Sequence, residues 1–490
     1  MLAALCAFGA SLAGSFHLDD YSLFSQDLWR PLEPRPLTYL TFWVNHQLGG
    51  QNPIGYHAVN LGLHVLAVVL LFYALRRLID ERAAFLSAAI FAVHPFAAEP
   101  VNYIFERSTI LATVFCLAAL LAWTKQRFWL ATAWFGAGLL SKEECVAFPL
   151  FLLLLSLSGP RDRRQLHAIA IMLALSMAAG LRVIVSGQAT HGSGIASQAG
   201  VSPLDYLLTQ GAVILRYLRQ LLFPWGFSVD PDIPIATGPL AYAAWVAIVA
   251  LTGSSLAMAG FASRRFSRDR PAFWFLAGLL LLLPSSSIFP AADLAADRRM
   301  YLPLIAFSAT LGLAGAVVRP RALLWIGIFA LAFLSFERTL IWRAELSLWS
   351  DAAAKAPRKI RPKIQLARAL GGSPGLAILA EAKSIAPDDP KVASEEGRIA
   401  IAMSNPQQAL LAFGRALSLQ PSDAAAHNNR GVALLMLDQK VAARSDFDRA
   451  LAIDPCEFDA RLNLMRLGVT ARPPSACKFS SEQLRALEGK

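Results

Sequence analysis

Long apolar runs recur along the first 338 residues, and they constrain the fold more than any other feature. A helix of about 20 apolar residues crosses the ~30 Å hydrocarbon layer of a membrane. Charged residues make up 16% of the chain, against roughly 25% in soluble proteins. The sequence therefore predicts an all-α, polytopic membrane helix bundle of about eleven helices. The runs lie near 1–16, 57–75, 83–98, 107–124, 128–141, 145–158, 165–186, 240–262, 272–290, 300–318 and 322–338.

Lys and Arg cluster in short loops between these runs, and the clusters predict the orientation. With eleven helices, every cluster falls on the same side, which the positive-inside rule makes cytoplasmic. The chain after residue 338 and the start of the first long loop then face outward. The clustered residues are Arg76, Arg77, Arg82, Lys125, Arg127, Arg161, Arg163, Arg164, Arg264, Arg265, Arg268, Arg270, Arg319 and Arg321.

One apolar segment fits this topology poorly. Asp205–Phe223 carries Arg216 and Arg219, and a membrane span here would move the cluster at Arg264–Arg270 to the outer side. We therefore expect an interfacial or re-entrant helix near the outer surface. Its two arginines either face lipid phosphates or simply extend to the interface.

The composition changes after residue 338 to a charged, Ala-rich pattern with a 34-residue repeat, which is typical of tetratricopeptide helix pairs. We expect a membrane domain over 1–338, a junction helix over 339–357, a short tetratricopeptide solenoid over 358–478 and a C-terminal tail over 479–490. Such a solenoid offers a concave surface that binds a protein or peptide partner. The repeated residues are Pro387, Pro421 and Pro455, Gly397 and Gly431, Phe413 and Phe447, and Ala416 and Ala450.

Charged and polar residues gather at the predicted outward ends of the membrane helices, beginning with an acidic pair that precedes a loop rich in Pro, Arg and aromatic residues. Each group alone fits a solvated loop or a helix cap. Together, on one face and at one depth, they predict a shared site, because folding does not require so many ionisable groups to face the same way. The groups are Asp19 with Asp20, Arg30 with Arg35, His94 with Glu99 and Arg107, Lys142 with Glu143 and Glu144, and Asp297 with Arg298 and Tyr301.

These residue types suit a particular chemistry. A carboxylate can act as general base and take the proton of an acceptor hydroxyl. Guanidinium and ammonium groups bind a phosphate leaving group and neutralise its developing charge. A membrane supplies a phosphate donor with a lipid tail. Sugar transfer from a polyprenyl-phosphate sugar meets all three conditions.

At these motifs the chain resembles the integral-membrane class C glycosyltransferases, which carry an acidic pair in the first outward loop. More closely, it is similar to the transmembrane and tetratricopeptide-repeat-containing O-mannosyltransferases and their bacterial relatives. It departs from their pattern in having Ser108-Thr109 after Arg107, where an acidic residue is expected, and in its short repeat array. The similarity is carried by Tyr56–Asn60 with His64, His94-Pro95 with Glu99 and Arg107, Leu140–Glu143, Tyr217–Arg219 with Pro224, Asp297-Arg298 with Tyr301–Pro303, and Arg338, Trp342, Glu345 and Leu348.

The resemblance implies an inverting transfer from a lipid-monophosphate sugar, with mannose as the candidate sugar. One carboxylate of Asp19 and Asp20 would be the catalytic base. The remaining residues would contact the donor phosphate or order its loop (Arg35, Arg107, Lys142 and Arg298), or would orient these groups or bind the acceptor (Glu99, Glu143 and Asp297), with His94 and Tyr301 in the same motifs.

The main interpretation is transfer to a protein hydroxyl at the outer face of a bacterial inner membrane, with the active site and the repeats in the periplasm. A lipid or envelope-glycan acceptor and a non-enzymatic scaffold that recruits proteins through the repeats are the alternatives. The expected partners are the lipid donor, the acceptor, membrane lipid and a protein or peptide on the repeats. Nucleic acid is not needed to explain the net charge of +11, because the arginines lie in predicted cytoplasmic loops.

No cofactor is assigned, and a divalent metal is left open. His17, His57, His64 and His94 are typical of hydrogen-bonded histidines in a helical core rather than of metal ligands. Two cysteines of the tail, Cys456 and Cys477, could form a disulfide if the tail lies in an oxidising compartment.

Overall fold

The computed structural model describes residues 1–24, 27–29, 34–159, 162–189, 201–261, 266–286, 291, 293–469 and 473–488. Its regular structure over these residues is helical, without strands, which confirms the predicted all-α fold. The chain divides into a larger unit, Met1–His17 with Trp29–Arg343, and a smaller unit, Leu18–Leu28 with Ala344–Lys490. Four arginines used in the predictions lie outside the described residues: Arg30, Arg161, Arg264 and Arg265.

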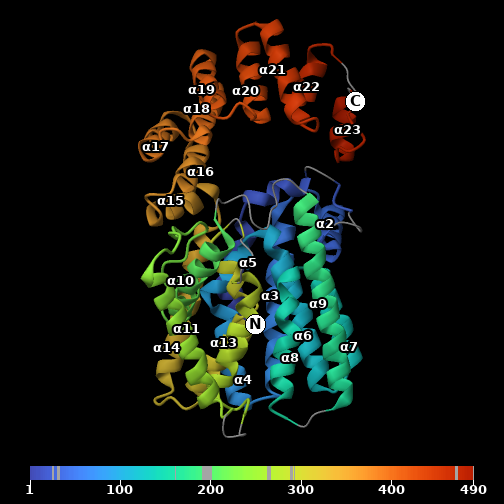
Figure 1. The fold of residues 1–490 in the computed structure, drawn as a ribbon, viewed down its shortest axis with the longest axis vertical. Helices are drawn as coiled ribbons and strands as arrows, with labels where there is room; N and C mark the ends of the chain where they lie inside the picture. Colours follow the sequence, from blue (N-terminus) through green and yellow to red (C-terminus); the bar gives the residue numbers. More distant parts are fainter. Residues whose placement is uncertain are drawn as a thin grey trace. The chain divides into compact units, whose positions relative to one another are not determined.

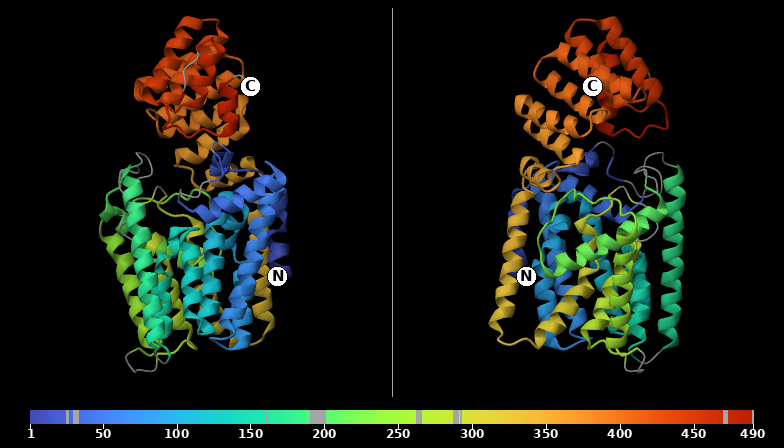
Figure 2. Two further views of the ribbon diagram at one scale, coloured as in Figure 1. Left: turned by 90° about the vertical axis from the view of Figure 1, so that its right-hand side faces the viewer. Right: turned by 60° about the vertical axis from the view of Figure 1, so that its left-hand side comes forward.

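The larger unit is a bundle of mostly apolar helices that run alongside one another, as Figures 1 and 2 show. Short 3₁₀ and α segments at the ends of these helices carry most of the predicted site residues. The helices are α1 (Leu2–Phe8), α2 (Pro36–Gly49), α3 (Pro53–Leu75), α4 (Glu81–Val93), α5 (Ala98–Asn102), α6 (Arg107–Thr124), α7 (Phe128–Leu139), α8 (Phe148–Ser156), α9 (Arg163–Ala189), α10 (Pro203–Leu222), α11 (Pro239–Met258), α12 (Pro271–Leu282), α13 (Leu304–Ala316) and α14 (Ala322–Ile341).

Proline determines where several of these helices begin. It is the first helical residue of α2, α3, α10, α11 and α12. A proline at this position lacks only an N–H that would have no intrahelical partner, and its φ is already helical. These helix starts therefore follow directly from local sequence.

Close packing of α4 against α13 brings two of the predicted motifs together. Gly312 of α13 faces Ala83 and Ser87 of α4, and a Cβ at Gly312 would lie 2.6 Å from the Ala83 carbonyl oxygen. At the other end of the pair, the rings of Phe91 and Tyr301 are 5.3 Å apart. The end of α4 and the segment before α13 are thus held side by side.

Five described helices are long and apolar enough to cross a membrane, and two bent helix pairs would raise that number to seven. Three further apolar helices are shorter: Phe128–Leu139, Pro271–Ser285 and Leu304–Ala316. A 12-residue helix is only about 18 Å long at 1.5 Å per residue. The predicted number of eleven membrane helices, like the orientation, stays a prediction.

Two segments that the sequence predicts to lie on the outer side are helical. The loop predicted after the acidic pair contains α2, so the expectation of a loop there was wrong for residues 36–49; Pro36 begins this helix, which ends at Gly49 and buries Thr38, Phe42 and Asn45. The segment Asp205–Phe223 forms most of α10, which is not among the helices apolar enough to span. Its interfacial or re-entrant placement stays a prediction.

The smaller unit contains the predicted tetratricopeptide region. Within it, three helix pairs stack in sequence order (Figure 1). The repeat explains the packing, because a Cβ at Gly397 would lie 2.7 Å from the ring of Phe413, and one at Gly431 would lie 2.5 Å from the ring of Phe447. The helices are α15 (Glu345–Lys355), α16 (Ile360–Leu370), α17 (Gly372–Ile385), α18 (Pro390–Ala402), α19 (Pro406–Leu419), α20 (Ala424–Met436), α21 (Lys440–Ile453), α22 (Phe458–Arg466) and α23 (Ser481–Leu487).

A disulfide between Cys456 and Cys477 closes the C-terminal end of the smaller unit. Next to it, the rings of Phe458 in α22 and Phe479 are 5.7 Å apart. The bond therefore attaches the segment that leads into α23 to the turn before α22.

Candidate functional site

The acidic pair lies in a short 3₁₀ helix of the smaller unit, Leu18–Phe24. Asp20 is fully buried and Asp19 is exposed, and Ser22 Oγ donates to the Asp19 carbonyl at 2.6 Å. Aspartate is almost never fully buried without a partner. All the other predicted site residues belong to the larger unit, so their meeting with the acidic pair stays a prediction.

Within the larger unit, Arg298 is the centre of an ion-pair network. Its Nη1 donates to Glu99 Oε1 at 2.7 Å, and its backbone N–H donates to Glu99 Oε2 at 3.0 Å. Its Nε lies 3.1 Å from Glu106 Oε1, and its Nη2 donates to Asp293 Oδ2 at 2.9 Å. The Arg298 side chain is 22% exposed, whereas those of Glu99 and Glu106 are almost fully buried. These charge-assisted bonds hold the segment before α13 against the region between α4 and α6.

Glu106 extends this network to Lys142. Lys142 Nζ donates to Glu106 Oε2 at 2.8 Å and to Thr109 Oγ1 at 2.7 Å, and the Thr109 hydroxyl donates to the same carboxylate. Glu144 Oε1 lies 3.4 Å from Lys142 Nζ. Glu106 therefore bridges Lys142 and Arg298, two cations that the sequence predicts to share a site.

A separate ion pair joins Arg35 to Glu143, and its side chains are more exposed than those of Lys142 and Glu106. Arg35 Nε donates to Glu143 Oε2 at 3.0 Å and Nη2 donates to Oε1 at 2.5 Å, which makes the pair bidentate. Burial alone would raise the pKa of the Glu143 carboxyl, but the Arg35 guanidinium lowers it to about 2. Arg35 is also the N-cap residue of α2, with a φ of +62°. The pair thus fixes the start of α2.

Arg107 is completely enclosed by α2, α3 and the start of α6. Its Nε donates to Asn60 Oδ1 at 2.8 Å, its Nη2 to the Tyr56 carbonyl at 2.9 Å and its Nη1 to the Thr41 carbonyl at 3.2 Å. The guanidinium also lies 4.4 Å from the centre of the Phe42 ring. These contacts make Arg107 a positioning residue for α2 and α3, and its predicted contact with a donor phosphate stays a prediction.

Asp297 lies beside the network and holds a different arginine. Its Oδ1 is 3.3 Å from Arg216 Nη1, and its Oδ2 accepts a hydrogen bond from the Ser228 backbone at 3.2 Å. Arg216 comes from α10, the helix predicted to lie near the outer surface. Asp297 therefore attaches α10 and the following loop to the segment that carries Arg298.

His94 and Tyr301 are held by hydrogen bonds at the adjoining ends of α4 and α13. His64 Nδ1 is 2.8 Å from the Tyr301 hydroxyl. His94 Nδ1 accepts from the Phe96 backbone N–H at 3.2 Å, and its Nε2 is 3.3 Å from the Leu221 carbonyl oxygen. Among the described residues, no group of three or more His, Cys, Asp or Glu side chains is placed to hold a metal ion.

Sequence reasoning missed two members of the network, Glu106 and Asp293. Glu106 directly precedes Arg107, whereas the resemblance directed attention to the residues after this arginine. The available signal was a carboxylate in the otherwise apolar stretch that leads into α6. Asp293 stands four residues before Asp297 in a short Ala-rich segment, where the only signal was its charge.

The composition of the network limits what it can do chemically. Four carboxylates, those of Glu99, Glu106, Glu144 and Asp293, surround the two cations Lys142 and Arg298. Because the carboxylates outnumber the cations, the interior of the network does not suit a phosphate, and only the exposed edge of Arg298 is open to one. The network is therefore suited to ordering the segment before α13, and its partly exposed arginine is the group that reaches its surface.

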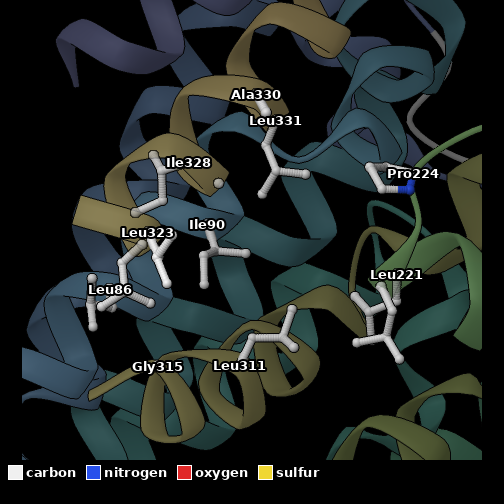
Figure 3. A pocket seen from close by; sticks show the side chains of 13 residues that line it. Leu86, Ile90, Leu221, Pro224, Leu311, Gly315, Leu323, Ile328, Ala330 and Leu331 are labelled. Atoms are coloured by element: carbon white, nitrogen blue, oxygen red, sulfur yellow. The ribbon is translucent and has the colours of Figure 1, made fainter. Parts of the chain in front are cut away.

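An apolar pocket of about 380 Å³ lies between α4, α13, α14 and the end of α10. Figure 3 shows Leu86, Ile90, Leu311, Ile328 and Leu331 around it, with Leu221 and Pro224 on one side. The carbonyl of Leu221 is the partner of His94. The pocket thus adjoins the end of α4.

Two parts of the chain match known protein families. Residues 32–185 match the family described as dolichyl-phosphate-mannose-protein mannosyltransferase, and residues 394–456 match the tetratricopeptide repeat family. The chain therefore combines a mannosyltransferase-type region with a tetratricopeptide region. The first match includes Arg35, Glu99, Arg107, Lys142 and Glu143.

Its homologues are protein O-mannosyl-transferases of the TMTC type, which confirms the predicted resemblance. The chain is 25% identical over 396 residues to Protein O-mannosyl-transferase TMTC3 of Mus musculus, covering 68% of this chain and 42% of that protein. It is 26% identical over 384 residues to Protein O-mannosyl-transferase F38B6.6 of Caenorhabditis elegans (71% and 54%) and 31% identical over 247 residues to Protein O-mannosyl-transferase Tmtc2 of Drosophila melanogaster (43% and 26%). The chain thus spans between 26% and 54% of the length of these relatives.

Proposed function

We propose that this chain is a membrane glycosyltransferase that moves a sugar, with mannose as the candidate, from a polyprenyl-phosphate donor to a protein hydroxyl. The observation that carries the proposal is the mannosyltransferase match over residues 32–185, which contains Glu99, Glu106 and Lys142 of the ion-pair network. The names of the homologues support a protein as acceptor.

The reaction needs a base and a neutralised leaving group. The acceptor hydroxyl oxygen attacks the anomeric carbon, its proton passes to one carboxylate of Asp19 and Asp20, and the bond from that carbon to the phosphate oxygen breaks with inversion. The lipid phosphate leaves with the bonding electrons. General-base assistance of this kind contributes about 10²–10⁴ to a rate.

The larger unit supplies the cationic side of the site in this proposal. Arg298 and Arg35, whose side chains are 22% and 28% exposed, meet the donor phosphate. Glu143 orients Arg35 by accepting from Nε and Nη2, and Glu99 orients Arg298 by accepting from Nη1 and the backbone N–H. Preorganised charges of this kind stabilise a leaving group without reorganising during the reaction. Lys142 orders the segment before α13 through Glu106, which also contacts Arg298.

Four further predicted residues act from the edges of this arrangement. Arg107 positions α2 and α3, and Asp297 positions α10 through Arg216. His94 and Tyr301 hold the ends of α4 and α13, next to the apolar pocket. That pocket supports a donor with a hydrocarbon tail, because it is lined by aliphatic side chains that include Leu221, the partner of His94.

The proposed location is a bacterial inner membrane, with the site and the repeats on the periplasmic side. The paired Cys456 and Cys477 support an oxidising compartment for the tail, because disulfides persist there and are rare in a reducing cytosol. The repeats bind the protein acceptor or another protein partner.

The test uses the purified full-length chain with a labelled polyprenyl-phosphate mannose and an extract of envelope proteins, lipids and glycans. The products are then separated by class. The proposal predicts that the label enters protein, by a linkage formed with inversion. Label found only in lipid or polysaccharide would show that the acceptor is not a protein. Absence of any transfer with a panel of lipid-phosphate sugars would contradict the proposal of a transferase.

A further inference from the structure

A polar groove of about 590 Å³ runs along the helix pairs of the smaller unit. Its lining comes from α16, α18, α20 and the start of α22, which are the first helices of successive repeats. Side chains of both charges line it, together with two asparagines, Asn428 and Asn429. The groove thus differs from the apolar pocket of the larger unit and has the composition of a surface for a polar ligand.

The charge of the groove reverses along the solenoid at equivalent positions. Lys391, Ala425 and Asp459 are each 34 residues apart, occupy the second position of α18, α20 and α22, and all line the groove. The same side-chain position therefore changes from positive, through neutral, to negative. The repeat geometry places these three residues in a row on one face.

The positive end of the groove lies at α16 and α18. Arg368 of α16 forms a bidentate pair with the buried carboxylate of Glu395, at 2.6 and 3.2 Å, and Arg398 Nη1 lies 3.2 Å from the same carboxylate. One carboxylate thus serves two guanidinium groups, and the side chains of Arg368 and Arg398 are 43% and 46% exposed. The exposed edges of these two arginines and of Lys391 give this end a net positive charge.

The negative end lies at the start of α22. Asp389 and Asp423 cap α18 and α20 through backbone N–H groups, but Glu457, the equivalent residue of α22, makes no side-chain cap bond. Burial and then the neighbouring carboxylates of Asp459, Asp454 and Asp423 raise the pKa of Glu457. Like charges held together are mutually destabilising, and a cationic ligand would relieve this repulsion.

The middle of the groove offers hydrogen-bonding groups that match a peptide backbone. Asn463 Nδ2 donates to Asn428 Oδ1 at 3.0 Å, and Asn428 Nδ2 donates to Asn429 Oδ1 at 3.3 Å. An asparagine amide has both a donor and an acceptor, as a peptide group does. Asn428 is 4% exposed and its amide is engaged by Asn463 and Asn429, so it holds in place Asn429, the more exposed of the two asparagines that line the groove.

We propose that this groove binds an extended polypeptide segment whose acidic end lies at α16 and α18 and whose basic end lies against Asp423, Glu457 and Asp459. Asn429 contacts the backbone between the two ends. The inference rests on the proposal that the repeats bind a polypeptide, and it specifies that polypeptide by the order of its charges. It does not depend on sugar transfer, so a binding assay without donor can fail while the transferase proposal stands.

The test measures binding of fluorescein-labelled synthetic peptides to the purified full-length protein in detergent, by fluorescence anisotropy at low ionic strength. One peptide has a glutamate block, a glycine-serine spacer and a lysine block, and it is made in both chain directions. The other has the same composition with alternating charges. At least one block peptide is expected to bind about tenfold more tightly than the alternating peptide. Equal affinities for all three would overturn the proposal without any variant.

A charge reversal at Asp459 provides the second arm. Asp459→Lys makes both ends of the row positive, so the block peptide should lose about tenfold in affinity and a peptide with glutamate blocks at both ends should gain about as much. The matched control is Asp448→Lys, the same charge change at an exposed position of α21 outside the groove lining. Equal effects of the two variants on both peptides would contradict a docking site, because they would reflect net charge alone.

Discussion

Arg298 donates two hydrogen bonds to the carboxylate of Glu99, 199 residues earlier in the chain, through Nη1 at 2.7 Å and the backbone N–H at 3.0 Å. Because the backbone takes part, the pair determines the path of the chain before α13 as well as the direction of the arginine. Glu106 then connects this arginine to Lys142. Two predicted site residues, Lys142 and Arg298, thus share one carboxylate that sequence reasoning did not select.

Replacement of that carboxylate tests the network. Glu106→Gln keeps the size of the side chain but leaves Lys142 and Arg298 without their shared charge. Removing one partner of a buried ion pair costs about 3–5 kcal/mol. We expect a lower unfolding temperature and at least tenfold slower sugar transfer, both measured on the same preparation. A tenfold loss of rate corresponds to about 1.4 kcal/mol of activation free energy.

The matched control for this change is Glu144→Gln, which removes the same group from the edge of the network. The Glu144 side chain is 33% exposed and lies 3.4 Å from Lys142. An exposed pair contributes roughly 0–1 kcal/mol. If both variants behaved alike, the bridging role of Glu106 would be refuted.

The Arg35–Glu143 pair predicts an acid sensitivity. The pKa of Glu143 is about 2 in the folded protein, below its ordinary value of 4.5. The folded state therefore binds fewer protons than the unfolded state in this interval, so the pair stabilises the fold above pH 4.5 and this stabilisation is lost as the pH falls towards 2. Thermal unfolding between pH 6 and roughly pH 3 should show a smaller loss in Glu143→Gln than in the wild type. Parallel curves for the two proteins would exclude this contribution.

The repeat glycines predict a packing effect in the smaller unit. A Cβ at Gly431 would lie 2.5 Å from the Phe447 ring, so Gly431→Ala should destabilise the solenoid by about 1–3 kcal/mol. Gly414 lies inside α19 with no atom within 4 Å of such a Cβ. Gly414→Ala should therefore stabilise by roughly 0.5–1 kcal/mol, the usual gain in a helix interior. Denaturant unfolding followed by helix content distinguishes the two, and effects of the same sign would contradict the described packing.

The disulfide predicts a redox dependence of the C-terminal segment. Closing a loop of 21 residues stabilises a fold by about 3 kcal/mol in the chain-entropy account. The double variant Cys456→Ser/Cys477→Ser should have a lower unfolding temperature of the smaller unit than the wild type. Reductant should lower this temperature in the wild type but not in the double variant. The free, exposed Cys6 provides the control, because Cys6→Ser should leave the reductant effect unchanged. A wild type indifferent to reductant would refute the stabilising role.

Much of the fold could be predicted because it follows from local patterns. Apolar runs of sufficient length placed most helices of the larger unit, and the offset between Gly397 and Gly431 gave the repeat period. The helix α2 was missed although Pro36 and Gly49 mark its ends, because its aromatic and polar residues lack a clear helical period. The number of membrane spans did not follow, since helices such as α12 are shorter than the hydrocarbon layer.

The charged residues could be predicted as a set but not as partners. The motifs named Glu99, Lys142 and Arg298, yet their contacts cross up to 199 residues and depend on tertiary packing. Arg107 shows the limit most clearly, because an arginine suited to phosphate is enclosed by Asn60, Tyr56 and neighbouring groups. No spacing in the sequence distinguishes a buried positioning arginine from one at a site surface.

The central proposal is that a carboxylate of Asp19 or Asp20 is the base for sugar transfer. The most direct measurement is the rate of transfer from a labelled polyprenyl-phosphate sugar by Asp19→Asn and Asp20→Asn, each compared with wild type at matched helix content and unfolding temperature. We predict that at least one variant folds normally and loses about 10²-fold or more in rate. Wild-type rates in both variants would contradict the proposed mechanism.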